Sequence, residues 1–492
     1  MFLQMFKTIV FLVIIWCCYF YQCHGCIEEE RTRLLQIKDS INYPYDSSLD
    51  EDWVGKNCCK WYGVECNSLS SRVISIDLSS RREEGLGLWY PNASLFAALK
   101  ELEELGLGEN HIGGWVAPQA FSEMQNLRDL NLSSNDLSAD IYSVRGLCEL
   151  KNLRGLYLGG NNLNGRSLPP CFSNLSMLED LSLSSNDLGS NSSALTGLCG
   201  LSALRTLRLS YNYINDNSLP MCLGNFSLLE NLYLSGNDLS GPFGNSISGL
   251  KRLRVLYLHS NHLSDDGISP WISNLTSLTT LWLQNNILKG SDGLRGLKQL
   301  QQLHLDSNHL TDDSIFPWIS NLTSLTTLWL GNNSLKGSDT MRGLCGLSAL
   351  RFLYLYDNDL SSLPICMGNF SLLEELYLFR NNLSGLFDSS VPGLKQLRIL
   401  QLGSNHLTDD VISPWISNLT SLTELYLGNN TLKGPHTMRG TMLFIFQKNT
   451  PKQTNYTNTK TTRVDSRPSL SKLVLQANLG NDLPIIVQPG LK

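Results

Sequence analysis

The sequence predicts a curved, right-handed solenoid of the α/β-repeat type, in which coils of near-equal length stack and a short parallel β-sheet lines the concave face. Two observations lead to this prediction. A nine-residue template, L-x-x-L-x-L-x-x-N, occurs fourteen times, and its last residue returns every 22 to 26 residues. Apolar and variable positions alternate within it, as in a strand with one buried face. The final asparagines are Asn110, Asn135, Asn161, Asn186, Asn212, Asn237, Asn261, Asn286, Asn308, Asn333, Asn358, Asn381, Asn405 and Asn430.

One copy of the template, residues 278–286, shows why the coils must stack. Alternation puts Leu281 and Leu283 on one side of a strand and Trp282 on the other. A single coil cannot bury these leucines, so neighbouring coils must cover them. An inward Asn286 can satisfy backbone groups of the turn that lack strand partners. The period is that of leucine-rich repeats, and a helical pattern does not explain the returning asparagine.

Length and charge set the broad class. A chain of 492 residues suggests about three domains by length alone, but a solenoid grows coil by coil and overrides that expectation. Lys and Arg total 38 against 44 Asp and Glu, which gives a formal net charge of −6. The repeats carry no basic stripe, so the sequence argues against a nucleic-acid partner.

The chain begins with a predicted secretory signal peptide at residues 1–25. Lys7 precedes an apolar run over residues 8–21, which is too short to span a bilayer comfortably and ends near the small residue Gly25. An uncleaved membrane anchor is the alternative. Cleavage after Gly25 makes Cys26 the first mature residue. Of 13 cysteines, Cys17, Cys18 and Cys23 leave with the signal, and the remaining even number favours disulfides in an oxidising compartment.

N-glycosylation sequons are frequent, although several are copies of one repeated segment. With the signal peptide, they predict an extracellular glycoprotein. The sequons are Asn92, Asn131, Asn174, Asn191, Asn225, Asn274, Asn321, Asn332, Asn369, Asn382, Asn418, Asn429 and Asn455.

Residues 26–70 are predicted to cap the solenoid. Ile27, Leu34, Leu35 and Ile41 recur at near-helical intervals, and the motif C-C-x-W-x-G-V-x-C follows at 58–66. This motif resembles the N-terminal cap of plant leucine-rich-repeat receptors. The resemblance implies the disulfides Cys26–Cys58 and Cys59–Cys66, whereas the sequence alone leaves three pairings for four cysteines. Unpaired core cysteines are the alternative reading.

The solenoid is expected over residues 71–434, with a degenerate first rung at 73–78. Residues 1 to about 434, including the segment 92–96, resemble plant receptor-like proteins, which carry an extracellular repeat domain and a membrane anchor but no kinase. Within the repeats, Gly-Leu-Cys is three times followed by Leu-Pro-x-Cys on the next coil. Each pair falls at nearly the same height, which suggests the disulfides Cys148–Cys171, Cys199–Cys222 and Cys345–Cys366; small buried apolar cysteines are the alternative.

The pattern breaks after Asn430. Residues 435–469 are rich in Thr, Lys, Asn, Gln and Pro, which predicts a disordered insert, and residues 470–492 are read as a residual repeat and a tail. An insertion, an unspliced segment and a decayed repeat are the three alternatives for this break. The receptor-like resemblance implies further repeats, a second cap, a transmembrane helix and a short tail. The late apolar runs are too short to span a bilayer, so we expect a truncated or naturally soluble chain.

No catalytic motif, metal site or cofactor site is predicted, so the chain is not expected to be an enzyme. His259 and His262 have a metal-like spacing, but His262 is a repeated residue beside a ladder asparagine. The Asp pairs at 265–266, 312–313 and 409–410 also repeat, and a solvated edge explains them better than calcium does.

The outward position between the second and third leucines of the template becomes mostly aromatic from Tyr233 onward. A strip of aromatic residues along the sheet is a candidate protein-binding surface, whereas simple stacking of strand aromatics is the alternative. The candidate ligand-binding residues are Tyr233, Tyr257, Trp282, His304, Trp329, Phe352, Tyr354, Tyr356, Tyr377, Phe379 and Tyr426. A second outward column alternates Arg and Glu, as at Arg154 and Glu179, and is read as a determinant of register and solubility.

Repeat physics alone predicts binding of a protein or peptide along the sheet. The resemblance implies a plant cell-surface receptor-like protein, which recognises an extracellular peptide or pathogen product in defence or development and signals through a partner receptor kinase. The expected location is the secretory pathway, then the extracellular space or plasma-membrane surface. The alternatives are a secreted enzyme inhibitor similar to the polygalacturonase-inhibiting proteins, a soluble decoy, or a truncated non-functional product.

Overall fold

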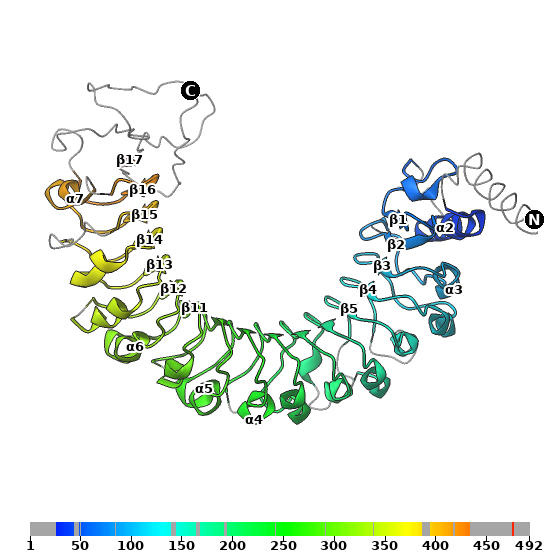
Figure 1. Ribbon diagram of the computed structural model, residues 1–492, viewed down its shortest axis with the longest axis horizontal. Helices are drawn as coiled ribbons and strands as arrows, with labels where there is room; N and C mark the ends of the chain where they lie inside the picture. Colours follow the sequence, from blue (N-terminus) through cyan, green and yellow to red (C-terminus); the bar gives the residue numbers. More distant parts are fainter. Residues whose placement is uncertain are drawn as a thin grey trace, which may run out of the picture. The chain divides into compact units, whose positions relative to one another are not determined.

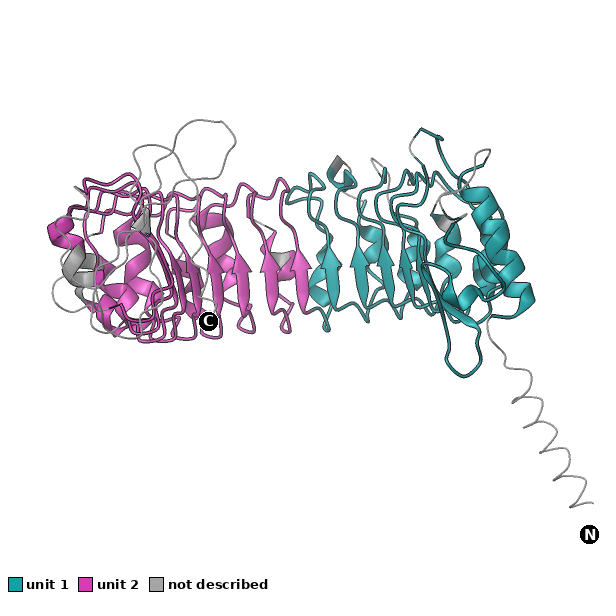
Figure 2. Cartoon of the chain, turned by 90° about the horizontal axis from the view of Figure 1, so that it is seen from above, with its two compact units in different colours: residues 1–229 teal, residues 230–492 magenta. Residues whose placement is uncertain are grey.

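The computed structural model describes most of the chain between Cys26 and residue 432. The described residues are 26–43, 49, 51–83, 85–138, 144–163, 168–190, 194–241, 243–290, 292–337, 339–385, 394–416, 419–432 and 475–476. The predicted signal peptide, the predicted insert at 435–469 and most of 470–492 lie outside them. The chain forms two compact units, residues 1–229 and residues 230–492 (Figure 2). Each unit is a stack of coils, so the predicted solenoid is confirmed.

Unit 1 contains the N-terminal cap and the first coils. Its strands are β1 (Val64–Cys66), β2 (Val73–Asp77), β3 (Glu104–Gly106), β4 (Asp129–Asn131), β5 (Gly155–Tyr157), β6 (Asp180–Ser182) and β7 (Thr206–Arg208). Its α-helices are α2 (Glu28–Ile41) and α3 (Ala93–Ala97). Its 3₁₀ helices are η2 (Cys58–Lys60), η3 (Pro118–Glu123), η4 (Arg145–Glu149), η5 (Pro170–Asn174), η6 (Leu188–Ser190), η7 (Thr196–Leu198) and η8 (Met221–Asn225).

Unit 2 repeats the same plan. Its strands are β8 (Asn231–Tyr233), β9 (Val255–Tyr257), β10 (Thr280–Trp282), β11 (Gln302–His304), β12 (Thr327–Trp329), β13 (Phe352–Tyr354), β14 (Glu375–Tyr377), β15 (Ile399–Gln401), β16 (Glu424–Tyr426) and β17 (Leu475–Gln476). Its helices are α4 (Gly244–Ile247), α5 (Asp265–Ile272), α6 (Asp312–Ile319), α7 (Asp409–Ile416), η9 (Asp292–Gly296), η10 (Asp339–Gly346) and η11 (Ile365–Asn369).

Strands and helices lie on opposite sides of each unit, as Figure 1 shows for β11 to β16 against α5 to α7. Within each unit the strands pair in parallel, except that β1 runs antiparallel to β2. The pairing aligns equivalent template positions: Leu281 of β10 lies beside Leu256 and Leu303. All three leucines are fully buried, because each coil covers the leucines of its neighbours.

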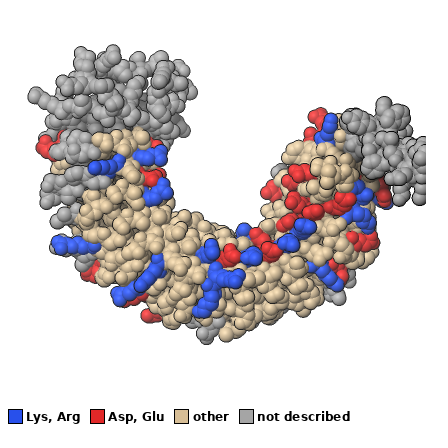
Figure 3. Space-filling model, in the orientation of Figure 1, with Lys and Arg blue, Asp and Glu red and all other residues tan. Residues whose placement is uncertain are grey.

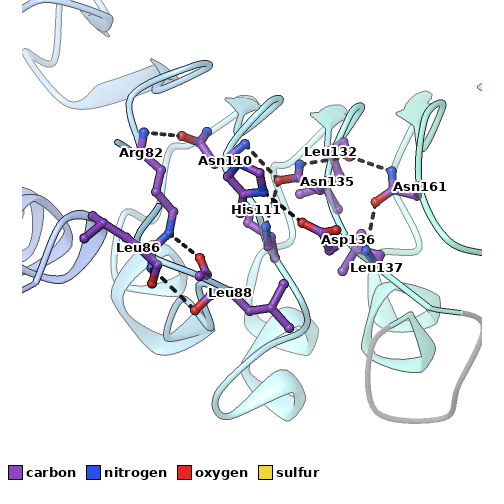
Figure 4. Close-up of polar contacts among 12 residues, drawn as sticks. Arg82, Leu86, Leu88, Asn110, His111, Leu132, Asn135, Asp136, Leu137 and Asn161 are labelled. Atoms are coloured by element: carbon purple, nitrogen blue, oxygen red, sulfur yellow. Dashed lines mark hydrogen bonds and ion pairs between the residues drawn. The ribbon is translucent and has the colours of Figure 1, made fainter. Parts of the chain in front are cut away.

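The inward asparagines form a hydrogen-bonded ladder, shown for three coils in Figure 4. The Asn135 side chain donates to the carbonyls of Leu107 and Leu132, and its oxygen accepts from the backbone N–H groups of Asn110 and Ile112. Asn161 repeats the pattern one coil later. Each side chain therefore satisfies backbone groups of its own turn and of the preceding coil, as the sequence predicted.

The residue before every ladder asparagine has a left-handed backbone, from Glu109 (φ 57°) to Asn429 (φ 57°). This conformation reverses the chain at the end of each strand. It costs most non-glycine residues about 1–2 kcal/mol, and Asn, which tolerates it better, occupies the position at Asn285, Asn332 and Asn429. Gly160 and Gly236 adopt it without that cost.

The cap helix α2 is tied to the first rung by a buried carboxylate. Glu30 is 1% exposed, accepts from Arg72 Nε at 2.7 Å and accepts from the backbone N–H of Val73 at 3.1 Å. The helix buries Leu34, Ile37 and Ile41. Two of the four apolar residues that predicted this helix do not belong to its buried face. Ile27 precedes the helix and is exposed, and Leu35 is only half-buried.

The repeated Asp pairs open the helices on the side away from the sheet. Asp265 and Asp266 lie in the first turn of α5, where acidic residues favour the helix dipole. The Asp265 carboxylate also accepts from the backbone N–H groups of Lys289 and Gly290 in the next coil, at 2.9 and 3.1 Å. Asp312 does the same for Lys336. These contacts between coils explain the repetition of the Asp residues. They correct the predicted solvated edge in part, because Asp312 and Asp409 are only 6% and 5% exposed.

Candidate ligand-binding face

The outward aromatic residues of unit 2 form one continuous stack, here called the aromatic ladder. Strand pairing sets neighbouring rings side by side, since Trp282 lies opposite Tyr257 on one strand and His304 on the next. The aromatic ladder comprises Tyr233, Tyr257, Trp282, His304, Trp329, Tyr354 and Tyr377, one from each of β8 to β14.

Most rings of the aromatic ladder stack face to face. The Tyr257 and Trp282 centroids are 4.0 Å apart with planes at 4°, and those of Trp329 and Tyr354 are 3.8 Å apart at 22°. Tyr233 instead meets Tyr257 edge-on at 86°. Each ring is half-buried, because its neighbours cover its faces. The stacking named as the alternative reading is thus present, and it covers much of each ring face in the predicted strip.

The remaining predicted aromatic residues lie around the aromatic ladder. Tyr356 and Phe379 form a second, parallel stack with centroids 4.9 Å apart. Tyr356 also meets Trp329 edge-on, at 6.4 Å. Phe352 is on β13 beside Arg351, whose guanidinium carbon lies 5.4 Å from the ring centroid. Tyr426 belongs to β16 and is separated from Tyr377 by Gln401 of β15.

A third outward column, two residues after each aromatic position, was recognised from the sequence only at Tyr356 and Phe379. It includes His259, Gln284 and Asp306 as well as Tyr356 and Phe379. In the described part of the chain, Trp282 Nε1, Gln284 Oε1 and Asp306 Oδ1 are buried atoms without a hydrogen-bond partner. These residues share one template position, so the column can be found in the sequence. Their side chains differ in chemistry, so the position does not stand out as a candidate site.

Burial shifts the titration of several groups on this face. It lowers the pKa of His304 to about 4, with a smaller contribution from His259, so the imidazole is neutral at pH 7. It raises the pKa of Asp306 to about 6. Burial, followed by the nearby Glu375 carboxylate, raises the pKa of Tyr354 and of Tyr377. Both hydroxyls donate to Glu375, at 3.2 and 3.1 Å.

The equivalent face of unit 1 is charged. Glu179 accepts from Arg154 at 3.0 Å and lies 3.4 Å from Arg205, and Asp180 pairs with Arg208. Figure 3 shows many acidic and basic atoms along the strand side of unit 1 and fewer along that of unit 2, where Arg351 pairs with Glu374 at 2.6 Å. Burial, then the nearby Glu104 and Asp180 carboxylates, raises the pKa of Asp129. Most charges here have a partner close by.

The described cysteines pair in the cap and between adjacent coils. Their Cα atoms are 5.4 to 5.7 Å apart, a separation that suits a disulfide. The bonds are Cys26–Cys58, Cys59–Cys66, Cys148–Cys171, Cys199–Cys222 and Cys345–Cys366.

Most described sequons are accessible. Asn92 and Asn131 are half-buried, and Asn191, Asn418 and Asn455 lie outside the described residues. The exposed sequon asparagines are Asn174, Asn225, Asn274, Asn321, Asn332, Asn369, Asn382 and Asn429.

Neither a metal site nor a membrane span is present in the part of the chain that the structure describes. No three His, Cys, Asp or Glu side chains there converge as metal ligands. His262 instead faces Asp238, with Nε2 3.8 Å from the carboxylate. No described helix combines the length and apolar character needed to cross a bilayer.

Sequence-family matches cover the cap and most of the coils. Residues 27–67 match the leucine-rich-repeat N-terminal domain. Residues 170–328 match a leucine-rich-repeat region, and residues 92–137, 152–175 and 371–432 match further leucine-rich repeats. Together with the coil architecture, these matches show that the chain belongs to the leucine-rich-repeat proteins.

The curated relatives are plant receptor-like proteins, so the resemblance stated from the sequence is confirmed. Cuscuta receptor 1 of Solanum lycopersicum is 30% identical over 49% of this chain and 20% of its own length. Receptor-like protein 9b of Arabidopsis thaliana is 34% identical over 33% of this chain and 18% of its own length. The chain therefore spans about a fifth of these relatives.

Solved plant receptor structures share the fold. The Arabidopsis receptor kinase HAESA, in complex with the peptide hormone IDA and the co-receptor SERK1, matches with a TM-score of 0.62 and 30% identity, over 84% of this chain and 68% of that chain. PEPR1 with AtPEP1 matches with a TM-score of 0.52 and 27% identity, over 84% of this chain and 53% of that chain.

Proposed function

We propose that this chain is the extracellular ligand-recognition part of a plant receptor-like protein, and that it binds a peptide or protein segment along the strand side of unit 2. The observation that carries the proposal is the aromatic ladder. Tyr and Trp side chains offer large contact area with little conformational entropy to lose, which makes them frequent hot spots of recognition.

The dimensions of the aromatic ladder suit an extended peptide. Seven rungs at about 4.8 Å per strand extend over about 29 Å. An extended chain advances about 3.3 Å per residue, so about nine residues cover that length. The HAESA complex with a peptide hormone gives independent support, since that receptor shares the coil architecture at 30% identity.

The proposed biological role follows from the relatives. The chain acts in the secretory pathway and at the cell surface, and it signals in defence or development through a partner receptor kinase. It catalyses no reaction itself. The co-receptor in the HAESA complex supports signalling through a partner.

The test uses the glycosylated full chain and a random dodecapeptide library displayed on phage. Peptides enriched on the wild-type chain are synthesised, and their affinities are measured for Trp282→Ala and Trp329→Ala. Loss of a central aromatic hot spot costs about 2 kcal/mol or more, so affinity is expected to fall tenfold or more. Tyr211→Ala and Tyr213→Ala are the matched controls, because both rings are exposed (56% and 65%) but lie outside the aromatic ladder. Unchanged affinity in both Trp variants would remove the aromatic ladder from recognition.

A further inference from the structure

Unit 2 holds a group of unused hydrogen-bonding atoms on two adjacent rungs. Trp282 and Gln284 come from the β10 coil, and Asp306 takes the Gln284 position in the β11 coil, because β10 and β11 pair with Trp282 opposite His304. In the described structure, Trp282 Nε1, Gln284 Oε1 and Asp306 Oδ1 are covered and have no partner. A buried polar atom without a partner is unfavourable, so a ligand that completes these hydrogen bonds removes that penalty on binding.

The Tyr356 ring lies near the Asp306 carboxylate. In the next coil, β12, the equivalent position is Gly331. The Tyr356 ring of the coil after that lies over this glycine. A Cβ atom at Gly331 would lie 2.4 Å from that ring. Burial raises the pKa of Tyr356, and the negative charge of Asp306 raises it further. A carboxylate and a nearby aromatic ring both attract cations, so this part of the face favours a basic group.

The surrounding charges leave Asp306 without a cation of its own. The outward residues of β8 to β16, and the residues two positions after each of these strands, include no Lys or Arg. Glu375 and Glu424 lie on the same face, but each accepts from tyrosine hydroxyls at 3.0–3.2 Å. The lowered pKa values of His259 and His304 keep both imidazoles neutral at pH 7.

We propose that Asp306, Gln284 and Tyr356 form a subsite for a basic side chain of the bound peptide. The proposal rests on the proposed function. Asp306 pairs with the guanidinium or ammonium group, Gln284 Oε1 accepts a second N–H, and Tyr356 offers its ring. A carboxylate rotates readily about its terminal torsion, so both oxygens can face the ligand. A guanidinium suits this site because its donors can reach two acceptors on adjacent rungs, about 4.8 Å apart.

The test compares peptides enriched from the dodecapeptide library on the full chain. We expect them to share an Arg or Lys, and replacing that Arg by the neutral isostere citrulline should weaken binding at least tenfold, as should Asp306→Asn. Asp292→Asn is the matched control. It removes the same charge from a carboxylate that is 80% exposed on η9, and it should leave affinity unchanged.

The outcomes separate this subsite from the proposed function. Peptides that need Trp329 but lack a basic residue, or that tolerate Asp306→Asn, overturn the subsite and leave binding along unit 2 standing. Peptides that are indifferent to Trp282→Ala and Trp329→Ala overturn both. A library that yields no enriched peptide also counts against both. An equal loss of affinity in Asp292→Asn would show a general charge effect and overturn the subsite.

Discussion

The two units have the same interior and different outward faces. Inside, Leu156 of unit 1 and Leu281 of unit 2 occupy the same template position and are equally buried. Outside, unit 1 presents paired charges such as Arg154 and Glu179, whereas unit 2 presents stacked rings. The inward columns therefore determine the coil, and the outward columns can change without changing it. This separation lets one repeat carry a solubilising face in one unit and a candidate binding face in the other.

Reduction of the disulfides should produce the largest difference between the units. Unit 1 contains four of the bonds and unit 2 contains only Cys345–Cys366. Each bond is expected to contribute about 2–4 kcal/mol. Hydrogen exchange with and without a reductant should show a greater loss of protection in unit 1. A non-reducing peptide map checks the pairs, and free thiols at Cys148 and Cys171 would contradict the pairing between coils.

Truncation of the shared core should affect both units alike. Leu156→Ala and Leu281→Ala each remove a fully buried side chain from a strand. Each should cost about 2–5 kcal/mol, because the coils cannot close the cavity completely. Denaturant unfolding, followed by hydrogen exchange in each unit, measures the two losses. A loss confined to one variant would show that the interiors are not equivalent.

Removal of a ladder asparagine should cost less than removal of a leucine. In Asn286→Ala, the carbonyls of Leu258 and Leu283 lose a donor and the N–H of Leu263 loses an acceptor. We expect a loss of about 1–3 kcal/mol, and the same for Asn161→Ala in unit 1. The measurement is the shift of the unfolding midpoint. Neutral substitutions in both units would remove the asparagine ladder as a source of stability.

The outward faces should differ in how their contacts respond to salt. A double-mutant cycle on Tyr257 and Trp282 should give a coupling of about 0.5–1.5 kcal/mol that salt hardly changes. The cycle on Arg154 and Glu179, both partly exposed, should give about 0–1 kcal/mol and vanish at high salt. Chemical unfolding at low and high ionic strength distinguishes them. A salt-sensitive aromatic coupling would contradict the stacking contact.

Acidification should have the smallest net effect, because two opposed titrations in unit 2 largely cancel. The folded pKa of His304 (about 4) lies below its ordinary value of 6.5, so its contribution to stability is lost as the pH falls from 6.5 toward 4. The pKa shift of Asp306 has the opposite sign. Its folded pKa (about 6) lies above 3.8, so its contribution is lost as the pH rises toward 6.

Single variants separate these opposed titrations. In His304→Gln, the melting temperature should fall less as the pH drops below 6.5. In Asp306→Asn, the melting temperature should fall less as the pH rises from 4 to 6. His259, whose pKa burial also lowers, lies on the same face and has the same sign as His304. Thermal unfolding at steps from pH 4 to pH 7 is the measurement. Parallel curves for His304→Gln and the wild type would contradict the assigned shift.

Much of the fold was predictable because the same pattern occurs in fourteen copies. Any one coil is ambiguous, but the recurrence of Leu and Asn specifies strand, turn and stacking together. The cap was predictable from the C-C-x-W-x-G-V-x-C motif. The buried Glu30 was not, because a glutamate in a first helical turn usually faces water and only its distant partner Arg72 explains it.

The candidate site was predictable only in part. Alternation placed the aromatic residues on the outward side, and strand spacing placed them in a row. Neither pattern could show how far the rings would cover each other's faces, because that depends on side-chain rotamers. The Asp306 column was missed because its neighbours Gln284 and Gly331 share no chemistry with it, so only their proximity in space indicates a site.

The asparagine ladder also affects how such a chain can evolve. Asn286 bonds only within its own coil and to the coil before it, so duplication of a whole coil preserves every bond on both sides of the insertion. The eleven-residue segment S-N-L-T-S-L-T-T-L-W-L is identical at 273–283 and 320–330. Such copying places Trp282 and Trp329 on the same face, so new recognition surface can arise by unequal recombination before any point mutation refines it.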